Sequence, residues 1–339
     1  MAWPPTPQTL VSSPFPVNFG YTYLQVSNTQ STATPTNFQQ YIQLPPYLSL
    51  NRFSLRFYAD PALTQPLYAW YETPTTVWVL LPDGVPANSS VNIYFNVGSP
   101  DGVYTGMAPN LSPTYGQYDN GQYVFLAYAN GNKPISSFTV YSGYTLSQAT
   151  GVAYGSTTIN ALKLTGYAST AGTLNFYLNT VSLPASASYI AEGNAQWYTS
   201  SGTGDTDIVA LIQSPSSSPN AIAVGGVPGY SYVFFDQEYI SSGIYNHNIN
   251  PQGRAGQSWV YGSLTYIAGS STFSAYTSST LYTPTYSGST TNPISSSGSN
   301  LYLGVIGSQI SGYPANAYWN WLRTRAYPPN GVQPSVSFV

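Results

Sequence analysis

Residues 317–327 read AYWNWLRTRAY, and this stretch decides the fold. It places two Trp and two Arg within residues 319–325, in a chain that has only 7 Trp and 7 Lys+Arg. Read as a strand, it alternates its side chains between two faces. The alternation puts both Trp and both Arg on one face: Trp319, Trp321, Arg323 and Arg325. Because both faces carry large side chains, we expect the strand to be covered on both sides.

Two interpretations of this strand are open. As a binding strip, it would display tryptophan and arginine, which dominate the hot spots of interfaces. As the closing strand of a core, it would bury its rings and hold its arginines by stacking or by ion pairing. We favour the core strand, because neighbouring Trp residues in phase are more often buried than displayed. Buried arginines need partners, and the candidates are Glu192, Asp236 and Glu238.

The composition is that of a charge-poor β protein. The chain has 339 residues, of which 42% are hydrophobic and only 5% are charged, against about 25% charged in ordinary soluble proteins. Its 33 Tyr, 30 Gly and 28 Pro favour strands and turns over helices. A net charge of −3 offers no basic patch for nucleic acid and no Lys/Arg cluster for an anionic membrane.

The scarcity of charge predicts tolerance of acid. Only 10 Asp+Glu and 1 His can change protonation state as the pH falls, so the stability lost through titration is expected to be small. We therefore predict a melting temperature that changes little between neutral pH and about pH 3. The absence of Cys rules out disulfides and thiolate sites, which fits an intracellular origin or a hot or acidic exterior.

No targeting signal is recognised in the chain. The opening MAWPPTPQTL lacks the basic and apolar regions of a signal peptide, and no apolar run approaches the ~20 residues of a membrane span. We expect three parts: a Pro-rich N-terminal arm over residues 1–20, a small β-sandwich over 21–122, and a larger domain over 123–339. The arm reads either as a disordered tail or as an element that docks on a neighbouring subunit.

Period-two patterns and turn residues predict an all-β chain. The first domain is expected to hold strands near residues 21–26, 38–44, 54–58, 76–81 and 91–97, with 76–81 (TVWVLL) as a buried central strand. The second is expected to hold strands near 123–128, 137–141, 161–164, 173–178, 189–198, 208–213, 230–235, 258–268, 271–276, 300–306, 318–327 and 332–339. No stretch of ten or more residues shows a convincing helical period.

The first domain resembles a family of unknown function from archaeal and bacterial surface proteins. The resemblance rests on LRFYAD (55–60), PLYAWYE (66–72), TVWVLLP (76–82) and NIYFNVGSP (92–100). The positions that match the family pattern are Asp60, Glu72, Trp78, Tyr94 and Gly98.

The second half resembles a concanavalin-like, lectin-type jelly roll. The resemblance is carried by YVFLAYANG (123–131), SWVYGSLTYI (258–267) and YWNWLRTRAYPP (318–329). Together the two resemblances imply a surface or virion setting and a sandwich fold, with no assigned catalytic residue.

Candidate chemistry is sparse. Asp236 and Glu238 have the spacing of a carboxylate pair on one strand face, as glycan hydrolysis requires. The longer acidic series of the glycosidases with this fold is missing, however, and we expect no enzyme activity. Asp205 and Asp207 follow a Gly-rich turn and are candidates for a calcium site, although no full ligand loop is present and a polar hairpin turn is the favoured alternative. His247 is the only histidine, so no zinc cluster and no cofactor is expected.

Other candidate sites are aromatic or lie in turns. Tryptophan rings can stack on sugars, so the ligand-binding candidates are Trp197, Trp259, Trp319, Trp321, Arg323 and Arg325. Asn88 and Asn110 begin glycosylation sequons. Turn residues or connectors are predicted around both asparagines.

The function expected from the sequence is that of a non-enzymatic virion structural protein of an archaeal virus: a capsid, spike or tail component. Its partners would be other copies of itself or other virion proteins, with cell-surface glycans as targets in host attachment. A cell-surface adhesin or filament subunit is the alternative, and a glycoside hydrolase is disfavoured. The expected location is the virion or the extracellular cell surface.

Overall fold

The computed structural model describes residues 23–49, 54–98, 120–166, 173–197, 206–215, 219–227, 233–240, 243–250, 259–278, 286–307 and 315–339. In the stretches 233–240 and 243–250 the description covers the backbone alone. The chain divides into two compact units, one made of Met1–Phe125 with Pro328–Val339 and the other of Leu126–Tyr327.

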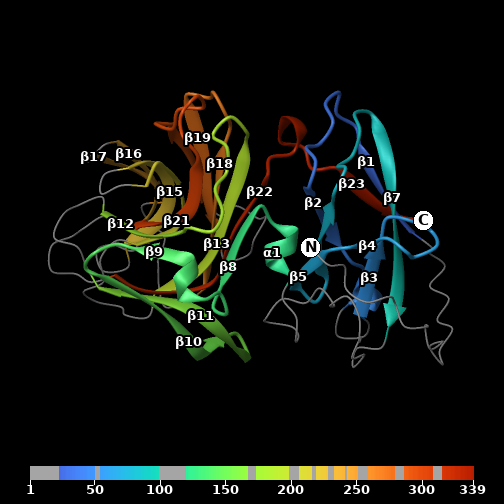
Figure 1. Cartoon of the computed structure of the whole chain (residues 1–339), viewed down its shortest axis with the longest axis horizontal. Coiled ribbons are helices and arrows are strands. Elements are labelled where there is room, and N and C mark those ends of the chain that lie inside the picture. Colours follow the sequence, from blue (N-terminus) through green and yellow to red (C-terminus); the bar gives the residue numbers. More distant parts are fainter. Residues whose placement is uncertain are drawn as a thin grey trace. The chain divides into compact units, whose positions relative to one another are not determined.

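The smaller unit is a β-sandwich (Figure 1). Its strands are β1 (Tyr23–Asn28), β2 (Phe38–Gln43), β3 (Ser54–Tyr58), β4 (Pro66–Leu67), β5 (Ala69–Thr73), β6 (Thr76–Leu81), β7 (Ser89–Gly98) and β23 (Ser335–Phe338). Within the described residues they form a 5-stranded sheet, β23-β1-β7-β3-β4, and a 3-stranded sheet, β2-β6-β5. Strand β6, TVWVLL, lies in the middle of its sheet and is almost wholly buried, which confirms the expected central strand.

The core of this sandwich follows from alternation along its strands. In β1, Leu24 and Val26 point inward while their neighbours are half-buried. Both residues belong to an apolar cluster with Ile42, Val77 and Ile93 from four strands of the two sheets. The period-two pattern of the sequence therefore marks the buried face directly.

The last residues of the chain belong to this smaller unit. Strand β23 pairs with β1, with Phe338 opposite Leu24 and Val336 opposite Val26. Gln40 of β2 also donates a hydrogen bond to the carbonyl of Pro334 at 3.0 Å. The expected domain of residues 123–339 is thus wrong at its C-terminal end. The apolar side of β23 completes the edge of the first sandwich, a long-range pairing that the local pattern does not encode.

The larger unit holds the remaining strands (Figure 1). They are β8 (Ala127–Asn130), β9 (Phe138–Val140), β10 (Tyr144–Tyr154), β11 (Thr157–Gly166), β12 (Thr173–Leu178), β13 (Tyr189–Trp197), β14 (Thr206–Gln213), β15 (Asn220–Val227), β16 (Val233–Ile240), β17 (Gly243–Asn250), β18 (Val260–Tyr266), β19 (Thr272–Ser278), β20 (Tyr286–Thr291), β21 (Leu301–Gly307) and β22 (Ala315–Ala326).

These strands form two antiparallel sheets in the described part of the chain. One is 8-stranded, β10-β11-β22-β13-β18-β19-β20 with β8 beside β22, and the other is 7-stranded, β17-β16-β15-β14-β21-β12-β9. The chain passes repeatedly from one sheet to the other, for example from β11 to β12, then to β13 and then to β14. This crossing between two antiparallel sheets makes a jelly roll. The expected fold class, a small sandwich followed by a larger jelly-roll sandwich, is therefore confirmed.

Helices contribute little to either unit. They are α1 (Gly121–Val124) and the single 3₁₀ turns η1 (Pro46–Leu48), η2 (Ile135–Ser137) and η3 (Pro329–Gly331). Among the described residues, none of these helices has the length or the apolar character that crossing a bilayer requires.

Candidate functional site

Strand β22 contains most of the stretch 317–327 (AYWNWLRTRAY). The side chains of this strand do not alternate between its two faces in the expected way. Trp319 pairs with Ala195 of β13, but Trp321 pairs with Asn194, so the register shifts at this point. Asn320 is the extra residue of a β-bulge, which inverts the inward and outward sense of the residues that follow. The expectation that Trp319, Trp321, Arg323 and Arg325 share one face is therefore wrong.

Trp319 faces the interior of the jelly roll. Its ring is fully buried in the core cluster with Leu322, and it meets the ring of Phe176 edge-on at 5.4 Å between centroids. Its indole Nε1 donates to the carbonyl of Ile208 at 2.8 Å. The contact crosses from one sheet to the other, so Trp319 ties the two layers of the sandwich together.

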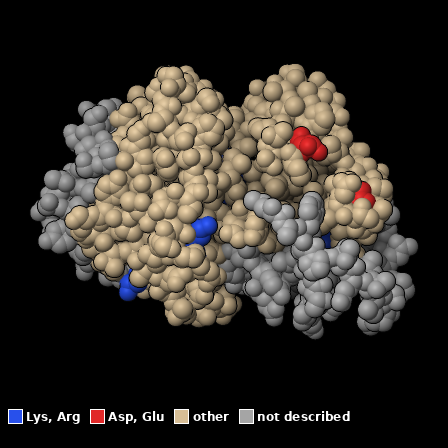
Figure 2. Space-filling view, in the orientation of Figure 1, with Lys and Arg blue, Asp and Glu red and all other residues tan. Residues whose placement is uncertain are grey.

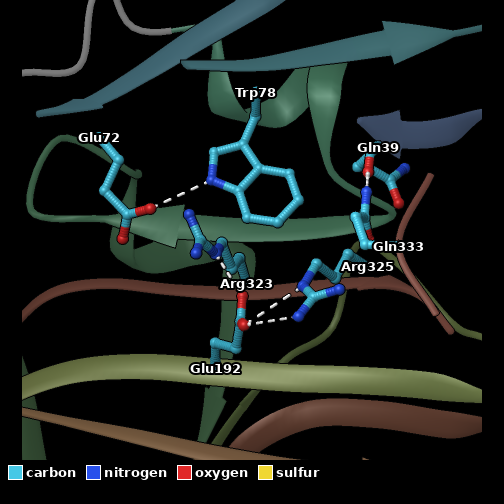
Figure 3. Close-up of polar contacts among 7 residues, drawn as sticks. All are labelled: Gln39, Glu72, Trp78, Glu192, Arg323, Arg325 and Gln333. Carbon is cyan, nitrogen blue, oxygen red and sulfur yellow. Dashed lines mark hydrogen bonds and ion pairs between the residues drawn. The ribbon is translucent and has the colours of Figure 1, made fainter. Parts of the chain in front are cut away.

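Past the bulge, both arginines of β22 meet a single carboxylate (Figure 3). Glu192 of β13 lies directly opposite Arg323. Arg323 Nε donates to Glu192 Oε2 at 2.7 Å. Arg325 donates to Oε1 from Nε at 3.2 Å and from Nη2 at 3.1 Å. Glu192 is thus confirmed as a partner of both arginines, while the side chains of the other two candidates, Asp236 and Glu238, lie outside the described residues.

Burial makes this ionic cluster unusual. Glu192 and Arg323 are fully buried, and Arg325 is 8% exposed. The guanidinium of Arg323 also lies 4.3 Å from the centroid of the Trp321 ring, close enough for a cation–π contact. A buried charge without a partner is very costly, so the three ionic side chains depend on one another.

The surroundings of Glu192 fix its protonation state. Burial alone would raise the pKa of its carboxyl group, but the charges of Arg323 and Arg325 and the hydrogen bonds that they donate outweigh burial, and its pKa lies below the usual value. A carboxylate held ionised between two guanidiniums is a poor proton donor at neutral pH. The chemistry of this cluster is thus structural, not that of a general acid.

Aromatic side chains lead from this cluster toward the surface. Tyr261 lies 6.0 Å from Trp321 between ring centroids, and its hydroxyl is 3.1 Å from that of Tyr154. Tyr154 in turn meets Trp259 edge-on at 5.3 Å, and Trp259 Nε1 donates to the Ala153 carbonyl at 2.8 Å. We call Tyr154, Trp259 and Tyr261 the aromatic strip; all three are half-buried.

The six expected ligand-binding residues are thus split by the structure. Trp197 and Trp319 are core residues, 1% and 0% exposed. Trp321, Arg323 and Arg325 lie on the opposite face of the sheet but are also buried. Trp259 alone among the six keeps a half-buried ring. Its tyrosine neighbours in the aromatic strip were missed, because Tyr154 and Tyr261 are far apart in the sequence.

The carboxylate pair considered for glycan hydrolysis lies on β16. The backbone register places Asp236 opposite Val224 and Glu238 opposite Ile222. The side chains of both acids lie outside the part of the chain that is described. His247 lies opposite Asp236 on the neighbouring strand β17.

The expected metal and glycosylation sites are only partly described. Asp205 and Asn110 lie outside the described residues. Asp207 is fully buried in β14, and no three His, Cys, Asp or Glu side chains gather at a metal-binding distance within the described ranges. Asn88 is exposed in a turn with a φ of 49°, and its backbone N–H bonds to the Gln30 carbonyl at 2.9 Å.

In the smaller unit, two acidic residues singled out by the family resemblance have structural contacts. Glu72 accepts a hydrogen bond from the indole Nε1 of Trp78 at 3.1 Å (Figure 3). Asp60 accepts bonds from the backbone N–H groups of Thr64 and Gln65, at 2.9 and 2.6 Å. Desolvation alone would raise the pKa of Asp60, but the hydrogen bonds together outweigh it, and the pKa lies below its usual value. Asp60 thus fixes its local backbone, while Glu72 holds the side chain of Trp78.

The surface drawn in Figure 2 is almost free of charge. Among the described residues on this face, the Lys or Arg and Asp or Glu side chains are isolated, and no patch of one sign gathers. This agrees with the 5% of charged residues in the whole chain. The few charges of the sequence include three that are buried together at Glu192.

The chain is similar to a viral protein. It is 36% identical over 332 residues to "Uncharacterized protein 562" of Sulfolobus islandicus rod-shaped virus 1, a match that covers 92% of this chain. The chain spans only 58% of that protein's length. No protein-family model matches, so the resemblance of the smaller unit to a surface-protein family stays a prediction.

The solved structures with a similar fold have low sequence identity to this chain and low TM-scores. Lectin I from Ulex europaeus is 14% identical, with a TM-score of 0.36, and the match covers 60% of this chain and 96% of the lectin. The β-glucanase of Bacillus licheniformis is 11% identical, with a TM-score of 0.33, over 63% of this chain and 96% of the enzyme. The CBM2 module of an evolved Dit protein from Lactobacillus casei BL23 phage J-1 is 11% identical, with a TM-score of 0.37, over 60% and 96%. Likenesses at these scores carry no functional argument.

Proposed function

We propose that this chain is a non-enzymatic structural protein of the virion of an archaeal virus, placed on its capsid, spike or tail. The observation that carries the proposal is the 36% identity with a protein of Sulfolobus islandicus rod-shaped virus 1 across 92% of the chain. Two antiparallel sandwiches with a charge-poor surface suit a coat component in a hot or acidic exterior, since few groups titrate there.

The contacts of the acidic residues support a role without catalysis. Glu192 is held by Arg323 and Arg325, which leaves it unsuited to proton donation. A glycosidase needs two carboxylates that flank an accessible bond. We expect no cleavage on a broad panel of glycans; cleavage that is lost in Glu238→Gln would make the chain an enzyme instead.

The virion role is tested by fractionation. Particles of the encoding virus would be purified on a density gradient and the chain quantified by mass spectrometry in every fraction. We expect it to follow the major coat protein at a constant ratio through the gradient. Recovery only from the soluble lysate would contradict the proposal, and recovery from the envelope of uninfected cells would favour the cell-surface adhesin.

A second candidate function is glycan binding in host attachment, favoured by the aromatic strip. Tyr154, Trp259 and Tyr261 present half-buried rings and hydroxyls, a combination that can stack on sugar rings and bond to their hydroxyls. On a glycan array, Trp259→Ala is expected to weaken binding, while Tyr123→Ala, at a 50% exposed position in the smaller unit, leaves it unchanged. Equal binding by both variants, or no binding by the wild type, would remove this function.

A further inference from the structure

An open groove of about 450 Å³ lies at one end of the smaller sandwich. Its lining comes from residues 43–47 (QLPPY) at the end of β2, from Thr75 before β6 and from Phe338 of β23. The groove therefore opens where strands of both sheets begin or end. We refer to it as the proline groove.

The lining of the proline groove is aromatic, prolyl and uncharged. Pro45 and Phe338 are half-buried, Pro46 is exposed, and Tyr47 is 37% exposed. Gln43 donates from its amide to the Thr75 carbonyl at 3.0 Å, which fixes the polar rim. Grooves lined by aromatic rings are the sites where proteins hold proline-rich segments in the polyproline II conformation, a helix that loses little entropy on binding.

The chain itself carries such a segment ahead of β1. Tyr23, the first residue of β1, exchanges backbone hydrogen bonds with Val339 at 3.0 and 3.5 Å, and Leu24 pairs with Phe338 of the lining. Strand β1 thus begins beside a residue that lines the groove. The sequence before β1 includes Pro14, Phe15 and Pro16, and an extended chain from Pro16 to Tyr23 can span about 23 Å.

We propose that the proline groove is the docking site of the segment Pro14-Phe15-Pro16 of the same chain. The covalent connection to β1 raises the effective concentration of the segment near the groove to about the millimolar range. Even a weak site would therefore be filled by its own chain first. The occupant carries no charge, which matches the uncharged lining. The inference goes beyond the virion role and does not depend on it.

The test uses the full chain and a labelled peptide of residues 10–20 (LVSSPFPVNFG). Binding is measured by fluorescence anisotropy to the wild type and to a variant with Pro14→Ser, Phe15→Ser and Pro16→Ser, whose own segment can no longer compete. A matched control carries Pro4→Ser, Pro5→Ser and Pro7→Ser. We expect the peptide to bind the first variant at least about tenfold more tightly than either the wild type or the control.

A second substitution assigns the site. Adding Tyr47→Ser to the first variant is expected to abolish peptide binding, whereas adding Tyr123→Ser, at another exposed tyrosine, is expected to leave it unchanged. Circular dichroism checks that each variant folds. The same samples are examined by light scattering for their oligomeric state.

Three results would overturn the proposal. Equal peptide binding by the wild type and the first variant would show that the segment does not compete. Binding that survives Tyr47→Ser would place the peptide elsewhere. A wild type that dimerises, together with a monomeric first variant, would show that the segment docks on a second copy instead of its own chain.

Discussion

Glu192 is the residue on which two buried cations depend. It is fully buried, and both of its carboxylate oxygens accept bonds from arginines of β22. Replacing such an ion pair by apolar groups can be neutral, but removing one partner leaves an uncompensated charge.

We predict that Glu192→Gln destabilises the protein by about 3–5 kcal/mol, because the glutamine keeps the size of the side chain but leaves Arg323 and Arg325 without their counter-charge. Urea unfolding followed by circular dichroism measures the change. Asp83→Asn, at an exposed position, is the control and should shift stability by no more than about 0.5 kcal/mol. If the two variants unfold alike, the cluster does not hold β13 and β22 together.

Three tryptophans should differ in how much their removal destabilises the protein, in the order of their burial. Trp319→Ala and Trp321→Ala should each cost about 3–5 kcal/mol, since both rings are at most 3% exposed. Trp259→Ala should cost less, because its ring is half-buried. Thermal melts of the three variants test the order; a Trp321→Ala variant that melts like the wild type would mean that this ring is not part of a packed layer.

The scarcity of charged residues makes the partner of the two buried arginines partly predictable from the sequence. With only 10 Asp+Glu in the chain, few carboxylates can pair with the two arginines, and Glu192 is among the three that the sequence suggests. Its selection depends on the pairing of β13 with β22. That pairing joins residues more than 130 positions apart, so no local pattern can reveal it.

Among the elements, β22 shows how one residue redirects a strand. Strict alternation would place both tryptophans and both arginines on one face. The bulge at Asn320 leaves Trp319 in the core and turns Trp321 and the arginines to the other face. A bulge arises from the match between two strands, so the sequence of one strand predicts the element but not its phase.

We predict that deleting Asn320 is tolerated, because Trp319 and Trp321 would then be consecutive, as Ala195 and Asn194 are, and each side chain would keep its face. Asn320→Ala is the matched control, since it keeps the extra residue and removes only the 3.2 Å bond to Asn194, at about 1 kcal/mol. Soluble yield and near-ultraviolet circular dichroism report on both. A deletion variant that fails to fold while the control folds would contradict the assignment of Asn320 as the extra residue of the bulge.

For the whole molecule, the pattern of strands and turns was enough to predict the class of fold. Period-two runs such as β1 and the buried run of β6 mark strands on their own. The return of β23 to the first sandwich was not predictable, because its pairing with β1 spans nearly the full chain. The proline groove was missed for the same reason, since Tyr47 and Phe338 meet only in the folded unit.

Acid stability is also a property of the whole molecule. The folded-state pKa of Glu192 is lowered, so its contribution to stability is present above its unfolded value of about 4.5 and is lost as the pH falls through the folded value. Asp60 shifts in the same direction. We expect a nearly constant melting temperature from pH 7 to about pH 4.5, and only a gradual decline below that range.

A series of thermal melts between pH 7 and pH 2 tests this expectation. In Glu192→Gln the decline below about pH 4.5 should be shallower, because the variant lacks the group whose protonation costs stability. A steep loss of structure above pH 4.5 in the wild type would contradict the view that little of the fold depends on titration.

If the chain is part of a virion, it should be visible on intact particles by electron microscopy. Particles of the encoding virus would be labelled with gold-conjugated antibodies raised against the chain and viewed by electron microscopy. We predict gold at a regular position on the body or the ends of intact, unpermeabilised particles. Bare particles beside labelled host cells, under the same conditions, would contradict the claim.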